Sequence, residues 1–118
     1  MTGLPTDYQT FIATSRYARY LEDEDRRETW GETVARYFNF MKDHLKKNYN
    51  YEMSADLEKE LFEGVLDLEV MPSMRALMTS GPALLRDNVC GYNCAYIPVD
   101  HPRAIEEALY ILMCETRV

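Results

Sequence analysis

The segment ETWGETVARYFNFMKDHLKK, residues 28–47, decides the fold of the first half of the chain. Its large apolar side chains recur at the i, i+4, i+7, i+8, i+11 and i+15 spacing of one helix face. They are Trp30, Val34, Tyr37, Phe38, Met41 and Leu45. Glutamates near the start and lysines at the end suit the helix dipole. The pattern predicts a helix over residues 28–48 with its apolar face in a core.

Further helices are predicted on both sides of this segment. Residues 8–20 place Phe11, Ile12, Ser15 and Arg19 at helical spacing. The charged stretch EDEDRRE, residues 22–28, is predicted to connect this helix to the next one. Ser54 suits the N-cap of a helix over residues 55–68 with a leucine and valine stripe. The side chains expected to be largely buried are Trp30, Tyr37, Phe38, Met41, Leu61 and Val65.

The composition changes at Met71, where small, turn-forming and apolar residues become frequent. Short helical turns are predicted near residues 73–86. Residues 92–98 are apolar at almost every position, which predicts a strand covered on both faces, and a last helix is predicted near residues 103–114. A buried strand needs a partner at each edge, and the sequence offers no second convincing strand. We therefore expect the chain to be part of something larger or to pack against other chains.

Composition restricts the classes of function. The chain has 118 residues, a formal net charge of -7 and 47% hydrophobic residues, which argues against disorder and against a nucleic-acid binder. Its apolar runs are too short to span a bilayer, and its first residues do not resemble a secretory signal. Three cysteines without framework spacing favour a reducing, cytoplasmic setting.

The cysteines allow several interpretations. Cys90 and Cys94 supply two thiols four residues apart, while Cys114, His44 and His101 are scattered, so a structural zinc site is disfavoured. A disulfide between the first two is disfavoured in a reducing compartment. From the pattern alone, Cys94 is favoured as a small core residue, and a reactive thiol is the alternative.

Residues 79–81, Thr-Ser-Gly, also have two interpretations. They could point N–H groups and hydroxyls at an anion. A plain helix end with Gly81 just beyond the C-cap is favoured on spacing. The chain contains no phosphate-loop motif.

Residues 15–44 and 71–114 resemble the N-terminal part of the adenosylcobalamin-dependent (class II) ribonucleotide reductases, in particular the monomeric ribonucleoside-triphosphate reductase type. The resemblance is carried by RRETW, PSMRAL, RDNV-GYNCAY and ALYILMC, in this order and at family-like spacing. It implies a mainly α chain with one or two strands. Residues 1–70 would form an N-terminal helical region. Residues 71–118 would begin a ten-stranded α/β barrel, truncated after its first strand.

The resemblance also implies the chemistry. Such enzymes reduce the 2′-hydroxyl of a ribonucleoside triphosphate. Adenosylcobalamin generates a thiyl radical that takes the 3′ hydrogen, a cysteine pair supplies the electrons, and a thioredoxin-like reductant resets that pair. Cys94 matches one member of the pair, on the first barrel strand, where a dry position would keep its thiol protonated. Cys90 is then incidental. Substrate contacts are implied for Asn93 and, more weakly, for Ser73, Thr79 and Ser80.

Other parts of the family pattern are expected beyond residue 118, including the radical cysteine, the partner of Cys94 and the cobalamin-binding segment. Glu115 and Arg117 stand where the family carries glycines, and a carboxylate there would repel a polyphosphate. We therefore expect an N-terminal fragment, located in the cytoplasm or in a viral host's cytoplasm and inactive unless a second chain completes the barrel. The alternative is a small helical interaction protein without chemistry, such as a subunit or inhibitor of a full-length reductase.

Overall fold

Helix α2, Trp30–Tyr49, is the longest element of the computed structural model, which describes residues 3–114 and 116–118. The Thr29 hydroxyl caps its first turn by accepting from the Glu32 N–H at 3.4 Å. Asn50 ends it in the left-handed conformation, at φ 50°. Short polar side chains tolerate that conformation better than most, so the helix stops there. The helix predicted over residues 28–48 is confirmed.

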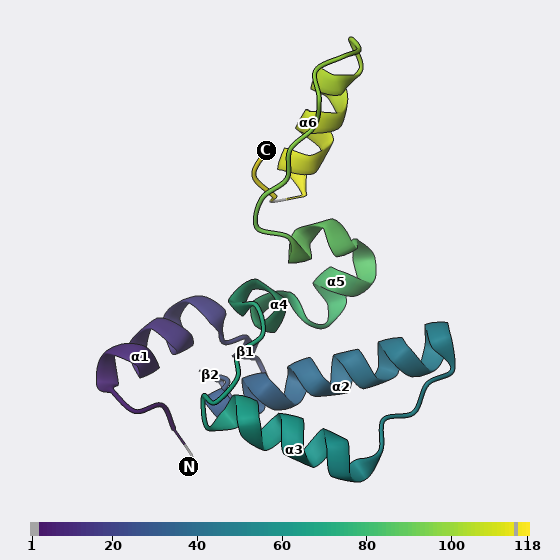
Figure 1. Ribbon diagram of the computed structural model, residues 1–118. Coiled ribbons are helices and arrows are strands. Elements are labelled where there is room, and N and C mark those ends of the chain that lie inside the picture. Colours follow the sequence, from purple (N-terminus) through teal and green to yellow (C-terminus); the bar gives the residue numbers. More distant parts are fainter. Residues whose placement is uncertain (1–2, 115) are drawn as a thin grey trace.

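Helix α3, Ala55–Leu66, returns alongside α2 and closes the core (Figure 1). The Ser54 hydroxyl accepts from the Leu57 N–H at 3.3 Å, which confirms the predicted N-cap. The indole N–H of Trp30 donates to the Leu66 carbonyl at 3.1 Å, so the start of α2 is fixed to the end of α3. The core cluster consists of Trp30, Val34, Phe38, Val65 and Leu77.

The burial predictions have mixed outcomes. Trp30, Phe38 and Val65 are buried as expected, while Tyr37 and Met41 are half-buried. Leu61 is 38% exposed, and its predicted burial is wrong. The reason is that α3 faces α2 with Phe62, whose ring lies 5.7 Å from that of Phe38, and the core face is therefore turned by one residue.

The N-terminal region differs from its prediction. The helix expected over residues 8–20 is α1, Asp7–Ile12, followed by one π-helical segment, η1, Ala13–Tyr17. The expected connector then forms a small antiparallel hairpin of β1, Tyr20–Leu21, and β2, Arg26–Arg27. Asp25 adopts a positive φ of 51° in the turn between the two strands, a conformation that aspartate tolerates better than most residues.

Short helices follow in the second half, as predicted near residues 73–86. They are α4, Met74–Thr79, and α5, Pro82–Arg86. A 3₁₀ segment, η2, Asn88–Gly91, comes next, and α6, Ala104–Met113, confirms the last predicted helix.

The strand predicted over residues 92–98 is wrong. Within the described part of the chain, this segment makes one isolated parallel bridge, between Cys94 and Arg117. Tyr96 is 91% exposed and Val99 is 81% exposed, so the apolar run is not covered on both faces. An extended segment becomes a strand only beside partner strands, and the described residues place none along this one.

The C-terminal part stands away from the core, as Figure 1 shows for α6 and the segment before it. The radius of gyration is 16.8 Å, against about 13.5 Å for a compact chain of this length. Many large apolar side chains of this part are exposed: Tyr92, Tyr96, Val99, Ile105, Leu109, Leu112 and Met113. The predicted division after residue 70 stays a prediction, although Leu77 from the second part is buried in the core of the first. Among the described residues, the helices are too short or too polar to cross a membrane.

Candidate functional site

An open pocket of about 300 Å³ lies beside the start of α4 and brings two predicted site residues together. Ser73 and Asn93 both line it, although they are far apart in sequence. Its remaining walls are formed by Tyr17, Met74, Arg75 and Met78. Sequence reasoning missed Arg75 as a site residue, although it lies within the PSMRAL element.

Helix α4 positions this pocket. The exposed Ser73 is its N-cap, and the hydroxyl accepts from the Ala76 N–H at 3.4 Å. The Arg75 Nε donates to the Cys90 carbonyl at 2.8 Å, which fixes η2 against α4. Asn93 follows η2 within two residues and is thereby held at the pocket.

Cys94 follows Asn93 directly and is exposed. The backbone around it is held by the C-terminal residues: Arg117 N donates to the Asn93 carbonyl at 3.1 Å, and Ala95 N donates to the Arg117 carbonyl at 2.7 Å. The Thr116 side chain is 1% exposed, and its hydroxyl contacts the carbonyls of Val89 and Tyr92. The dry environment expected for the Cys94 thiol is therefore not formed by the described residues alone.

The other predicted positions lie elsewhere. Thr79 and Ser80 are buried and do not line the pocket; their hydroxyls donate to the carbonyls of Arg75, at 2.7 Å, and Ala76. Ser80 is the C-cap of α4, so Gly81 lies just beyond it, as favoured from spacing. Glu115 lies outside the described residues.

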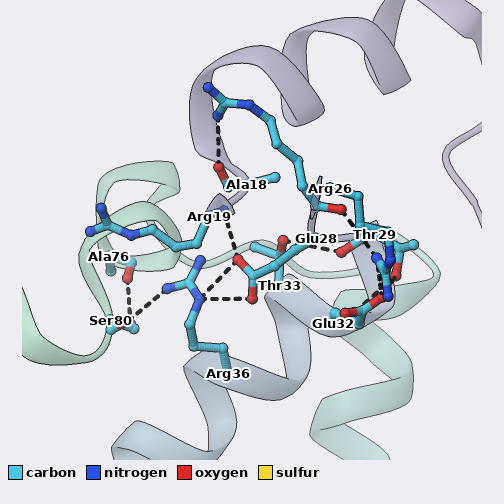
Figure 2. Close-up of polar contacts among 11 residues, drawn as sticks. Ala18, Arg19, Arg26, Glu28, Thr29, Glu32, Thr33, Arg36, Ala76 and Ser80 are labelled. Atoms are coloured by element: carbon cyan, nitrogen blue, oxygen red, sulfur yellow. Dashed lines mark hydrogen bonds and ion pairs between the residues drawn. The ribbon is translucent and has the colours of Figure 1, made fainter. Parts of the chain in front are cut away.

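An ion pair between Glu28 and Arg36 contacts the turn at residues 79–81, and the sequence did not predict it. The carboxylate of Glu28 is buried, and both of its oxygens accept from the Arg36 Nε at 3.1 Å (Figure 2). The Arg36 Nη1 donates to the Ser80 carbonyl at 2.6 Å. Glu28 belongs to the RRETW element, which was the available signal, but spacing could not name its partners.

A second polar cluster joins α6 to η2. The hydroxyl of Tyr110 donates to Asp87 Oδ2 at 2.6 Å, and the other carboxylate oxygen accepts from the Val89 N–H at 3.0 Å. Both hydrogen bonds lower the pKa of Asp87, and the bond from Tyr110 has the larger effect. The same carboxylate raises the pKa of Tyr110 to about 12. The Cys114 thiol lies 3.8 Å from Asp87 Oδ2.

This cluster predicts a pH-dependent contribution to stability. Because the pKa of Asp87 is lowered in the folded state, its contribution is present above the unfolded value and is lost as the pH falls through the folded one. The raised pKa of Tyr110 gives a contribution that is present below about pH 10 and lost towards pH 12. Tyr110→Phe should therefore lower the melting temperature between about pH 5 and 9 and have less effect outside this range.

Circular dichroism at 222 nm across this pH range checks the prediction. Tyr96→Phe, at a hydroxyl that is 91% exposed, is the matched control and should leave the melting temperature unchanged. A Tyr110→Phe effect of constant size from pH 3 to 11 would contradict the assignment.

The cysteines and acidic residues give no candidate metal site in the described part of the chain, where no three His, Cys, Asp or Glu side chains gather around one point. Cys94 and Cys114 are free thiols. The candidate site is therefore a pocket lined in part by Ser73, Arg75 and Asn93, with the exposed Cys94 following Asn93 in the chain.

Comparison of the sequence with known proteins identifies a family. The family model of the ribonucleotide reductase alpha domain matches residues 4–82, which include α4 and Ser73 but end before Asn93 and Cys94. No solved structure matches the chain significantly.

One curated relative is an adenosylcobalamin-dependent ribonucleoside-triphosphate reductase of Lactobacillus gasseri, 34% identical over 91 residues. The match covers 70% of this chain and 12% of the relative, so the chain spans about an eighth of that protein's length. Because the family model covers more than half of the chain, the protein belongs to the ribonucleotide reductase alpha domain family.

Proposed function

We propose that this chain forms the N-terminal, substrate-side part of an adenosylcobalamin-dependent ribonucleoside-triphosphate reductase in the cytoplasm. The whole enzyme would reduce ribonucleoside triphosphates to 2′-deoxyribonucleotides for DNA synthesis, with a thioredoxin-like reductant. The observation that carries the proposal is the pocket shared by Ser73 and Asn93, with the Cys94 thiol next to it in the chain. Family membership supports the same reading.

Cys94 would be one member of the reducing cysteine pair. The pair loses two protons and two electrons as it becomes a disulfide, and the substrate takes them up as its 2′-hydroxyl is replaced by hydrogen and leaves as water. In this scheme the Cys94 S–H protonates the departing hydroxyl. Its partner thiol is expected beyond residue 118. An exposed thiol would have to be covered for this step, because water competes for the proton and solvates charge.

The pocket residues would bind the nucleotide. Asn93 and Ser73 offer an amide and a hydroxyl to the ribose and phosphate oxygens, and the Arg75 guanidinium on the same wall favours an anionic ligand. Thr79 and Ser80 would act indirectly, since their hydroxyls already donate within α4. We assign none of these residues to adenosylcobalamin.

A polypeptide that completes the barrel is the proposed partner of the C-terminal part. Tyr92, Tyr96 and Val99 precede α6 and are all more than half exposed, as are several large apolar side chains of α6 itself. Large apolar side chains that lie exposed in such number on one part of a chain favour a surface that contacts other protein. The same surface would serve the alternative, an interaction protein that binds an intact reductase, and the nucleotide pocket favours the enzyme part.

Nucleotide binding by the chain tests the proposal. We expect calorimetric titration with magnesium CTP to detect binding to the wild-type chain. Asn93→Ala should weaken the affinity about tenfold, the usual effect of losing hydrogen bonds to a ligand. Asn48→Ala, at an exposed site on α2, is the matched control and should bind like the wild type. Absence of CTP binding, or equal affinities of the Asn93→Ala and Asn48→Ala variants, would contradict the proposed site.

A further inference from the structure

The buried carboxylate of Glu28 is fixed by the hairpin that precedes α2. Glu28 and Arg19 continue the ladder of β1 and β2 by one residue, with the Glu28 N–H donating to the Arg19 carbonyl at 2.8 Å. The Arg19 N–H donates back to the Glu28 side chain at 2.7 Å, to Oε1. The carboxylate therefore has a defined direction, and its 6% exposure excludes most water.

Arg36 transmits this direction to the end of α4. Its Nε faces both carboxylate oxygens, and its Nη1 faces the Ser80 carbonyl, which lies 44 residues along the chain (Figure 2). A guanidinium is planar and holds its N–H groups in fixed directions. Once Nε is set by Glu28, the donor that meets Ser80 is set as well.

The Ser80 carbonyl belongs to the peptide at which the chain leaves α4. Gly81 follows with φ 125° and ψ -138°, a conformation that L side chains rarely adopt, and α5 begins directly afterwards. The direction of this peptide thus decides how α5 and η2 leave α4. At the other end of the six-residue helix stands Ser73, and Arg75 fixes η2 through the Cys90 carbonyl.

We propose that Glu28 and Arg36 form a buried clamp that positions the 79–81 turn and, through the short helix α4, the nucleotide pocket at Ser73 and Asn93. The two residues are positioning residues, since neither lines the pocket. This inference rests on the proposed function for its link to nucleotide affinity. Its structural part, the hold on the turn, stands independently.

Electrostatics supports a clamp with a single arrangement. A buried carboxylate is costly unless it is paired and hydrogen-bonded, and Glu28 has both an ion pair and a backbone donor. Removing the Arg36 guanidinium leaves a buried charge without its partner and also frees the Ser80 carbonyl. Lysine at position 36 keeps the charge, but its three donors share one nitrogen, which cannot take the places of both Nε at Glu28 and Nη1 at Ser80.

Amide hydrogen exchange tests the structural part. In Arg36→Met, exchange of the amides in residues 80–86, apart from Pro82, should accelerate about ten- to a hundredfold, as expected for losing a hydrogen bond from a charged donor. Arg36→Lys should give a smaller acceleration in the same residues. Lys42→Met is the matched control, because Lys42 lies on α2 like Arg36 and the substitution removes its 3.0 Å ion pair with Glu58 of α3. It should leave exchange in residues 80–86 unchanged.

Nucleotide affinity tests the link to function. Arg36→Lys and Glu28→Gln, which remove less than Arg36→Met, should both lower magnesium CTP affinity several-fold, and Lys42→Met should not. Unchanged exchange over residues 80–86 in all clamp variants would overturn the clamp, whether or not CTP binds. Faster exchange with unchanged CTP affinity would overturn its role in positioning the pocket. A wild-type chain that does not bind CTP would instead overturn the proposed function, and the exchange result would still decide the clamp.

Discussion

Cys94→Ser is expected to reduce dithiol-dependent nucleotide reduction to the background of a no-protein control. The assay combines the chain with a polypeptide that carries the remainder of a ribonucleotide reductase, adenosylcobalamin, a ribonucleoside triphosphate and a dithiol. A serine hydroxyl cannot become half of a disulfide, so the pair cannot deliver its two electrons. The effect should therefore be complete rather than partial. Deoxynucleotide formation is measured by chromatography.

Cys90→Ser is the matched control for this substitution. The Cys90 thiol lies 3.1 Å from the Asp87 carbonyl, where a serine hydroxyl can donate equally well, and turnover should persist. The chain without its complement should form no deoxynucleotide, because its match covers only 12% of the relative. Turnover by the Cys94→Ser assembly, or loss of turnover in Cys90→Ser alone, would reverse the assignment of the two cysteines.

The sequence predicted the helices where the signal is local. The apolar period of α2 and α3, and the cap of α3 at Ser54, act within a few residues of one another, so the pattern contains most of the information. The hairpin at residues 20–27 was missed because two-residue strands carry no period. The orientation of α3 was missed by one residue because Phe62 packs against Phe38, a contact that depends on both helices.

The candidate site shows the same difference between local signals, which the sequence carries, and distant contacts, which it does not. The prediction of a strand over residues 92–98 was wrong because a strand depends on partner strands that are distant in sequence. An apolar run is equally compatible with an extended segment whose side chains are exposed. Ser73 and Asn93 were predicted as substrate contacts from the family resemblance, and the structure shows that both line one pocket. Spacing in the sequence could not have predicted that proximity. The bond between Arg36 and the Ser80 carbonyl spans 44 residues and involves a backbone oxygen. Residue type cannot signal such an acceptor, since every residue has one.

Trp30→Ala is expected to destabilise the chain by about 3–5 kcal/mol, the usual cost of truncating a buried tryptophan. Trp30 is 8% exposed, packs in the cluster with Val34 and Leu77, and donates to the Leu66 carbonyl. The substitution thus leaves a cavity and an unpaired carbonyl between α2 and α3. Domains of this size have about 5–15 kcal/mol of stability, so a large share would be lost. Urea unfolding followed by circular dichroism measures the change.

Leu61→Ala separates the observed core from the one predicted by the stripe. The periodic pattern predicted that Leu61 and Trp30 are both buried. Leu61 is instead 38% exposed, because Phe62 occupies the face of α3 towards α2. A leucine that retains this much contact with water leaves a smaller cavity, and we expect a loss of about 1 kcal/mol or less. If Leu61→Ala cost as much as Trp30→Ala, α3 would face α2 with its leucine stripe. In that case the contact between Phe38 and Phe62 could not define the core.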